Sequence, residues 1–162
     1  MAVEIACPLG GATPKQPTIG AKDIINSPYL HVTDNAVMNS VLLRECFNKN
    51  IEHFVFFICT VMYPSSINPL SENDLDYNKE ILHTYYGVGN TKIYIEKMCK
   101  FFSERSNTKF TVIRHTNIFG PHDKFDLKKS HFFGATVNKL YNSIDGNIEV
   151  WGDGREKRDL LY

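Results

Sequence analysis

The 162 residues are enough for one domain with a real hydrophobic core, since 43% of them are apolar or aromatic. The 18 basic and 18 acidic side chains give a formal net charge of zero, which argues against a dedicated nucleic-acid-binding protein. The four widely spaced cysteines form no Cys-x-x-Cys pair and no apolar run approaches about 20 residues, so we expect a cytoplasmic protein with reduced thiols, no metal site and no membrane partner.

Strand-like and helix-like segments alternate along the first half of the chain. Residues 2–6 form a short apolar run, residues 8–28 have loop composition, and residues 29–50 carry apolar side chains at helical spacing. Residues 53–61 are a continuous apolar run, which is typical of a central strand buried on both faces of a parallel sheet.

The same alternation continues toward the end of the chain. In chain order we expect a loop, a helix, a buried strand, a loop, a helix and a short strand at residues 64–80, 89–106, 110–114, 117–129, 131–144 and 148–151. Alternating strands and helices are typical of βαβ units, so the predicted fold class is α/β with a parallel sheet.

Several sequence blocks match the pattern of one protein family. They are the runs at 6–11 and 55–64, the block Thr-Asn-Ile-Phe-Gly-Pro-His-Asp-Lys-Phe at 116–125, Ser130-His131, and Val-Trp-Gly-Asp-Gly at 150–154 with Arg158. Together they resemble the extended short-chain dehydrogenases/reductases, in particular the NAD-dependent epimerase/dehydratase family and its nucleotide-sugar epimerase/reductases of the GDP-L-fucose synthase type. The resemblance extends over nearly the whole chain.

The resemblance implies a partial, Rossmann-like, doubly wound parallel sheet that lacks its N-terminal βαβ half. It implies a partial nucleotide-binding domain at 1–115, the start of a substrate-binding region at 116–162, a nucleotide-sugar substrate, and NADP or NAD as cofactor. The family seats the cofactor pyrophosphate on a Gly-x-x-Gly-x-x-Gly turn, which this sequence does not contain. We therefore expect a truncated piece of the family whose cofactor binding is weakened or lost.

In the family, a tyrosine four residues before a lysine acts as acid/base, because the lysine lowers the pKa of the tyrosine and holds the nicotinamide ribose. The resemblance assigns that lysine to Lys92, but Val88 stands four residues earlier. Tyr86 would reach Lys92 only if residues 87–89 are not helical. Otherwise Tyr86 is an ordinary loop residue.

The family also uses a hydroxyl group at a strand end and a cysteine close to it. Its serine falls on Cys59 and the next residue is Thr60, which would offer a hydroxyl group if the strand end shifted by one position. The alternative is that both are buried small residues of a strand. Val61 stands where the family has its proton-shuttling cysteine, so the epimerase half of the chemistry departs from the pattern.

His131 matches the family's acid histidine, and Asn117 an asparagine near cofactor and substrate. The alternatives are a helix-start histidine capped by Ser130 and a loop asparagine that bonds its own backbone. Asn35 matches a cofactor-site asparagine that supports the lysine through water, or else is a solvated or back-bonded helix residue.

Arg158 and Trp151 match substrate-binding positions. Arginine suits a nucleotide diphosphate because its guanidinium group donates two parallel hydrogen bonds, although Arg158 could also be simply exposed. The sequence thus leaves three functions open: an enzyme, a non-catalytic truncated or split remnant, and a nucleotide-sugar-binding module. The resemblance also implies a homodimer through the helices at 29–50 and 89–106.

Overall fold

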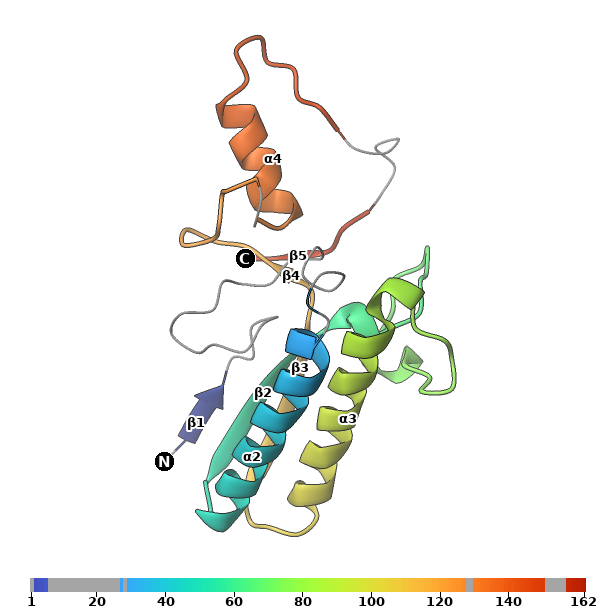
Figure 1. Cartoon of the computed structure of the whole chain (residues 1–162), viewed down its shortest axis with the longest axis vertical. Helices are drawn as coiled ribbons and strands as arrows, with labels where there is room; N and C mark the ends of the chain where they lie inside the picture. Colours follow the sequence, from blue (N-terminus) through green and yellow to red (C-terminus); the bar gives the residue numbers. More distant parts are fainter. Residues whose placement is uncertain (1, 6–26, 28, 128–129, 151–156) are drawn as a thin grey trace. The chain divides into compact units, whose positions relative to one another are not determined.

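A computed structural model describes residues 2–5, 27, 29–127, 130–150 and 157–162 (Figure 1). It divides the chain into two compact units, Met1–His115 and Thr116–Tyr162. The predicted loop at 8–28 lies outside the described residues, except for residue 27.

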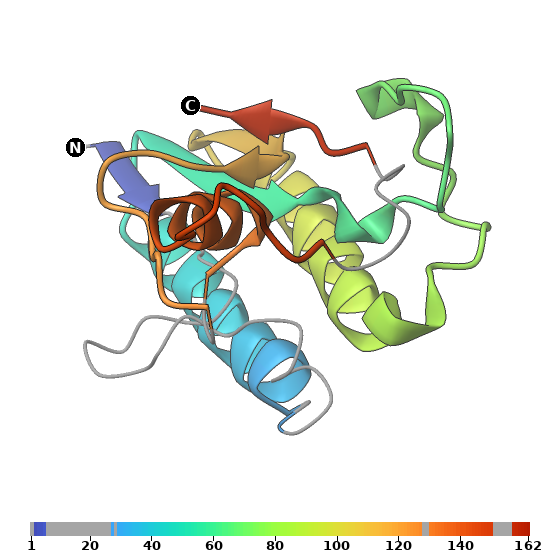
Figure 2. The same cartoon turned by 90° about the horizontal axis from the view of Figure 1, so that it is seen from above.

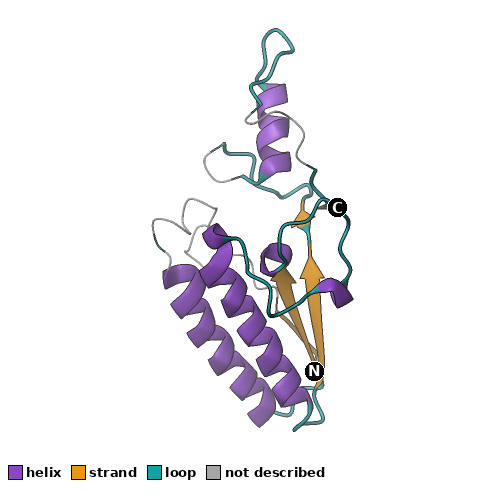
Figure 3. Ribbon diagram, turned by 90° about the vertical axis from the view of Figure 1, so that its right-hand side faces the viewer, coloured by secondary structure: helices purple, strands orange, loops and turns teal. Residues whose placement is uncertain are grey.

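The first unit is a parallel sheet with two helices packed on one face (Figure 3). Strands β1 (Ala2–Ile5), β2 (His53–Cys59) and β3 (Lys109–His115) are adjacent in that order and pair in parallel. Helices α2 (Asn35–Asn48) and α3 (Tyr86–Ser103) connect β1 to β2 and β2 to β3, and lie side by side. The predicted α/β class with a parallel sheet is confirmed.

The predicted helix at 29–50 is present but begins with a wider turn. Leu30–Asp34 form the five-residue π-helical turn η1, and α2 follows directly. The side-chain amide of Asn35 donates to the carbonyl of Leu30 at 2.7 Å. The helix stops because Asn50 adopts a positive φ of 49° and Ile51 N donates back to the carbonyl of Cys46 at 3.1 Å.

Helix α3 begins three residues before the predicted start at 89, because two glycines in its first turns serve close packing. A β-carbon on Gly87 would lie 2.9 Å from the Cγ2 atom of Val32, and one on Gly89 would lie 2.9 Å from the Cδ1 atom of Ile81. Glycine in a sequence indicates a helix breaker, whereas here it allows η1 and the chain before α3 to approach the helix.

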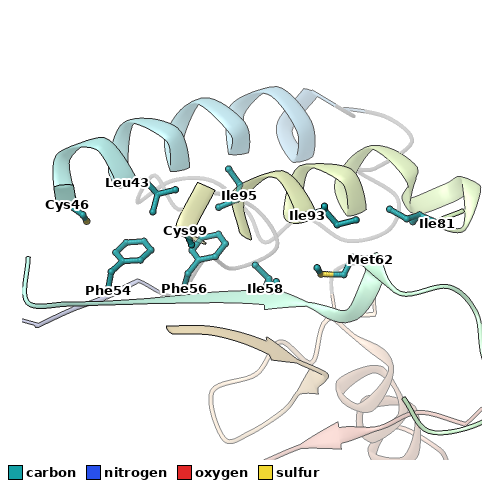
Figure 4. Packing of buried hydrophobic residues seen from close by; sticks show 10 residues of the cluster. All are labelled: Leu43, Cys46, Phe54, Phe56, Ile58, Met62, Ile81, Ile93, Ile95 and Cys99. Atoms are coloured by element: carbon teal, nitrogen blue, oxygen red, sulfur yellow. The ribbon is translucent and has the colours of Figure 1, made fainter. Parts of the chain in front are cut away.

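The core lies between the helices and one face of the sheet (Figure 4). Phe54, Phe56 and Ile58 of β2 are fully buried there, and the intervening residues Val55 and Phe57 are only half-buried. The prediction that β2 is buried on both faces is therefore wrong for these residues, because α2 and α3 cover one face only.

Strand β3 covers the predicted strand at 110–114, but it is not buried. Its residues alternate between exposed and half-buried, as expected of a strand with helices on one side and a sheet neighbour on one edge. At its end the guanidinium group of Arg114 pairs with the Glu96 carboxylate of α3, and donates to the Tyr63 hydroxyl at 2.7 Å and the carbonyl of Glu72 at 2.8 Å. These bonds fasten the predicted loop at 64–80 to the sheet and to α3.

The second unit contains α4 (Phe132–Tyr141) and two short parallel strands, β4 (Asn117–Ile118) and β5 (Leu160–Leu161). Figure 2 shows the same elements from above. The helix is shorter than the predicted 131–144. The predicted strand at 148–151 is wrong for residues 148–150, and residue 151 lies outside the described residues.

Pairing across the chain explains this last difference. The backbone of Phe119 donates to the carbonyl of Leu161 at 2.9 Å, and its ring lies 4.2 Å from that of Phe133 and 5.4 Å from that of Tyr162. A short strand is stable only when it pairs with a neighbouring strand. Leu160–Leu161 pair with β4, whereas residues 148–150 are not part of a strand.

Candidate functional site

Lys92 is the most unusual residue of the first unit. It lies in the middle of α3 with only 3% of its surface exposed, and its ammonium nitrogen lies 5.8 Å above the ring centre of Phe56. Lysine is rarely buried without a compensating interaction, and an aromatic face attracts a cation. The sequence match and the burial therefore single out the same lysine.

Tyr86 does not share the position of Lys92. Residues 87–89 are helical, so the condition for a contact between the two side chains is not met, and that part of the prediction is wrong. Six residues of α-helix separate them by about 9 Å along the axis and about 120° around it. Tyr86 is 62% exposed, whereas Val88, four residues before Lys92, is 2% exposed and occupies the inner face instead.

Asn35 belongs to a row of buried polar side chains on the inner side of η1 and α2. His31, Asn35 and Asn39 recur every fourth residue and are all buried, and these elements pack against α3. The amide of Asn39 donates to the carbonyl of Asn35 at 2.8 Å, and that of Asn35 to the carbonyl of Leu30. Asn35 is thus back-bonded and buried rather than solvated. His31 and Asn39 were missed, although their helical spacing from Asn35 was the signal.

Cys59 and Thr60, the two candidate residues at the end of β2, differ in secondary structure and in burial. Cys59 is the last residue of the strand and is buried, whereas Thr60 is exposed and begins the 3-10 turn η2 (Thr60–Met62). Thr60 therefore does not replace Cys59 by a shift of the strand. Cys59 pairs in register with His115 at the end of β3.

In the second unit, Asn117 is exposed on β4 and its amide donates to the carbonyl of Asp159 at 3.4 Å. Thr116 donates to the same carbonyl through its hydroxyl group at 2.8 Å. The reading of Asn117 as a loop residue bonding its own backbone is therefore wrong. Arg158, the residue before Asp159 in the sequence, is exposed. Trp151 lies outside the described residues.

His131 occupies the N-cap position of α4 and is half-buried. The hydroxyl oxygen of Ser130 has no hydrogen-bond partner among the described residues, so the reading in which Ser130 caps the helix is wrong. A β-carbon on Gly134 would lie 2.5 Å from the carbonyl oxygen of Lys124, so α4 sits tightly on the turn at 120–124. That turn closes with a bond from Asp123 N to the carbonyl of Gly120 at 3.0 Å.

The residues present fit only part of a dinucleotide cofactor. Lys92 is suited to a ribose, but the sequence contains no glycine-rich turn for the pyrophosphate. Within the described part of the chain, no cluster of three His, Cys, Asp or Glu side chains is placed to hold a metal ion, and no helix is both long and apolar enough to cross a membrane. The predicted proximity of residues 116–131 to Lys92 stays a prediction.

Comparison with known proteins matches this chain to one family and to GDP-sugar synthases. The model of the NAD dependent epimerase/dehydratase family matches residues 19–162. The chain is 28% identical to a GDP-L-colitose synthase of Yersinia pseudotuberculosis over 142 residues, and 28% identical to a GDP-L-fucose synthase of Sinorhizobium fredii over 147 residues. These alignments cover 85% and 88% of this chain and 46% of each relative.

Among solved structures, a GDP-L-fucose synthetase of Naegleria fowleri bound to NADP superposes with a TM-score of 0.79 at 22% identity, over 99% of this chain and 51% of that one. A GDP-D-glycero-L-gluco-heptose synthase of Campylobacter jejuni, determined in the presence of NADPH, gives a TM-score of 0.68 at 25% identity, over 78% of this chain and 38% of that one. The chain thus spans about half the length of the proteins it matches.

Proposed function

The chain belongs to the NAD dependent epimerase/dehydratase family, and from that premise we propose that it forms the nucleotide-sugar-binding part of an NAD(P)-dependent epimerase/reductase of the GDP-L-fucose synthase type. The named relatives at 28% identity are synthases of GDP-linked sugars, which supports a GDP-linked keto sugar as the substrate class. We place the protein in the cytoplasm.

The observation that carries the proposal is the buried lysine on α3. The ammonium group of Lys92 is buried in the middle of α3 and lies above the ring of Phe56, and a buried ionisable group at a position matched to the family supports a functional role. For the first unit, we propose that Lys92 and Asn35 serve the cofactor and that Cys59 serves the reacting end of the sugar. For the second unit, we propose that His131 serves as the acid. Asn117, Arg158 and Trp151 bind the nucleotide sugar.

The cofactor would supply hydride when bound, and the given sequence contains no Gly-x-x-Gly-x-x-Gly turn for its pyrophosphate. The chemistry proposed for its own residues is therefore binding and proton placement. Arg158 is exposed and donates to the diphosphate, and His131 presents an imidazole at the start of α4. Tyr86 keeps an acid/base role only if it acts without contact to Lys92.

A second candidate, binding of the nucleotide sugar without redox chemistry, is favoured by one specific observation. Val88 occupies the buried position of α3 four residues before Lys92, whereas the side chain of Tyr86 is exposed. A phenol without a cation beside it is a poor base at neutral pH. The chain would then bind its sugar nucleotide and leave the hydride step to another component.

A thermal-shift titration of the purified chain tests the proposal and separates the two candidates. Ligand at a hundred times its Kd stabilises a protein by about 2.7 kcal/mol, which raises Tm by several degrees. We expect a saturable shift with GDP-fucose that Arg158→Ala removes and Lys157→Ala, its exposed neighbour, leaves unchanged.

The enzyme candidate further requires a shift with NADPH that Lys92→Met removes and Lys97→Met, on the exposed side of α3, preserves. A shift with GDP-fucose alone favours the binding candidate. If neither ligand shifts Tm, the proposed function is overturned.

A homodimer through α2 and α3 stays a prediction. It is supported by exposed apolar side chains on these helices, at Val37, Val41, Tyr94 and Phe101.

A further inference from the structure

The two faces of the parallel sheet in the first unit are covered unequally. Helices α2 and α3 both lie on one face (Figure 3), where Phe54, Phe56 and Ile58 are fully buried (Figure 4). Among the described residues of this unit there is no further α-helix. Sheets made only of parallel strands occur almost exclusively with both faces covered. The second face therefore needs a cover that α2 and α3 do not provide.

Strand alternation shows which side chains lie on the second face. Phe110 and Val112 of β3 pack against the core, so Ile113 points to the opposite side of the sheet. In β2, Val55 and Phe57 alternate with the fully buried residues in the same way. The register pairs Phe57 with Ile113, and Val55 precedes Phe57 by two residues. Three apolar side chains are therefore adjacent in the middle of this face.

These three side chains are incompletely buried. Ile113 is 39% exposed, and Val55 and Phe57 are half-buried. Polar groups border them toward the amino ends of the strands, where a ring nitrogen of His53 contacts the hydroxyl group of Thr111 at 2.9 Å. An exposed apolar centre with a polar rim is typical of a surface that binds another polypeptide.

The same sheet has an open edge at β1. The strand order is β1-β2-β3, and among the described strands β1 pairs only with β2. The outward N–H and C=O groups of an edge strand can pair with a further strand. A strand–helix unit can complete both features at once, because its strand pairs with the edge and its helix lies on the adjacent face.

The comparisons indicate which polypeptide fits this surface. The matched region is 46% of the Yersinia pseudotuberculosis synthase and 51% of the Naegleria fowleri structure, so each contains about as much chain outside that region as within it. We propose that the β1 edge and the face of Val55, Phe57 and Ile113 dock the complementary half of this family's fold, through a parallel strand and an amphipathic helix. The inference goes beyond the proposed function, because docking needs neither sugar nor dinucleotide.

Co-expression with that half tests the docking. The probe is the part of the Yersinia pseudotuberculosis GDP-L-colitose synthase that lies outside its alignment with this chain. We expect an equimolar complex in sedimentation velocity. Hydrogen exchange followed by NMR should slow at the amides of β1 in the complex, because their outward groups become paired, and should stay unchanged in α2 on the other face.

Two matched substitutions locate the surface. Ile113→Lys places a charge in the middle of the second face and should weaken the complex at least about tenfold, because the charge would be buried without a partner. Ile67→Lys makes the same chemical change at a residue that is 95% exposed in the loop at 64–80, and should leave the affinity unchanged. Both should change Tm of the isolated chain by less than about 2 °C, since both positions are exposed.

The proposal is overturned if the two polypeptides do not co-purify, or if both substitutions weaken the complex equally. A large fall in Tm of the isolated chain with Ile113→Lys also overturns it, since the chain itself would then cover the face. So does a dimer of the chain alone that Ile113→Lys dissociates, since a second copy would then be the occupant. Because no ligand is added, each of these failures is distinct from failure of the proposed function.

Discussion

The two units of the chain differ in how much of their own surface they bury. The first unit encloses Leu43, Phe54, Phe56, Ile58 and Ile95 completely between its helices and sheet. In the second unit, Gly134 is the one described residue that is buried. Large apolar side chains stay exposed there, at Phe132, Leu140, Tyr141 and Ile144. A sheet covered by helices makes a core, whereas one helix and two two-residue strands do not.

The comparison teaches that the two units depend on different interactions. The first is stabilised by buried apolar area, and substitutions inside it should lower the free energy of unfolding of that unit. The second is organised by a few close contacts around Phe119 and Gly134, so its exposed apolar side chains should contribute little.

The largest expected effect comes from truncating the centre of the core. Phe56→Ala removes a fully buried ring that also faces the ammonium group of Lys92, and should lower the free energy of unfolding by about 3 to 5 kcal/mol. Ile144→Ala removes an apolar side chain of the second unit that is fully exposed, and should change it by less than about 0.5 kcal/mol. Urea denaturation followed by circular dichroism measures both. Equal losses would show that the two units are not stabilised in different ways.

A smaller effect should come from the charge pair at the carboxyl end of the sheet. The side chains of Arg114 and Glu96 are 13% and 17% exposed, and they tie the loop after Tyr63 to β3 and α3. Glu96→Gln leaves a mostly buried guanidinium without its counter-charge, and we expect a loss of about 1 to 3 kcal/mol with faster proteolysis of residues 64–80.

The matched control for this charge pair is Glu104→Gln. The pair of Glu104 with Arg105 is 56% and 53% exposed, and water screens such a pair. Its loss should leave stability and proteolysis unchanged. If Glu96→Gln behaves in the same way, the buried pair does not hold the loop.

The smallest effect is expected in the second unit, from a substitution that tests whether this unit contains close packing. Gly134→Ala places a β-carbon 2.5 Å from the backbone oxygen of Lys124, which must shift, although alanine favours the helix by about 1 kcal/mol. We expect a net local loss of about 1 kcal/mol, seen as faster hydrogen exchange of the α4 amides. Gly120→Ala meets no atom within 4 Å and should not change exchange. Unchanged exchange in Gly134→Ala would mean that α4 does not rest on the turn.

Much of the fold could be predicted because its signals are local. The apolar run at residues 53–61 and the helical spacing in residues 29–50 were enough to place β2 and α2. The start of α3 was missed because a glycine signals a break, unless a neighbour such as Val32 needs the space. The pairing of β5 with β4 was missed because two-residue strands carry no periodic pattern.

The candidate site shows the same division. Lys92, Asn35 and the block at 116–125 were found by matching residue types at given spacings. The family model covers these positions, and their roles stay predictions. The separation of Tyr86 from Lys92 could not be found in this way. It depends on whether residues 87–89 are helical, which the packing of Gly87 and Gly89 against their neighbours decides.

The sequence by itself determined the alternation of strands and helices, the family, and the presence of a lysine without its tyrosine four residues earlier, because these are properties of residue type and spacing. Only the tertiary structure decided that Lys92 is buried over Phe56, that Val88 takes the inner position, and that Cys59 and His115 are neighbours. Strand register joins residues that are far apart in the chain, and no local pattern records which of them will meet.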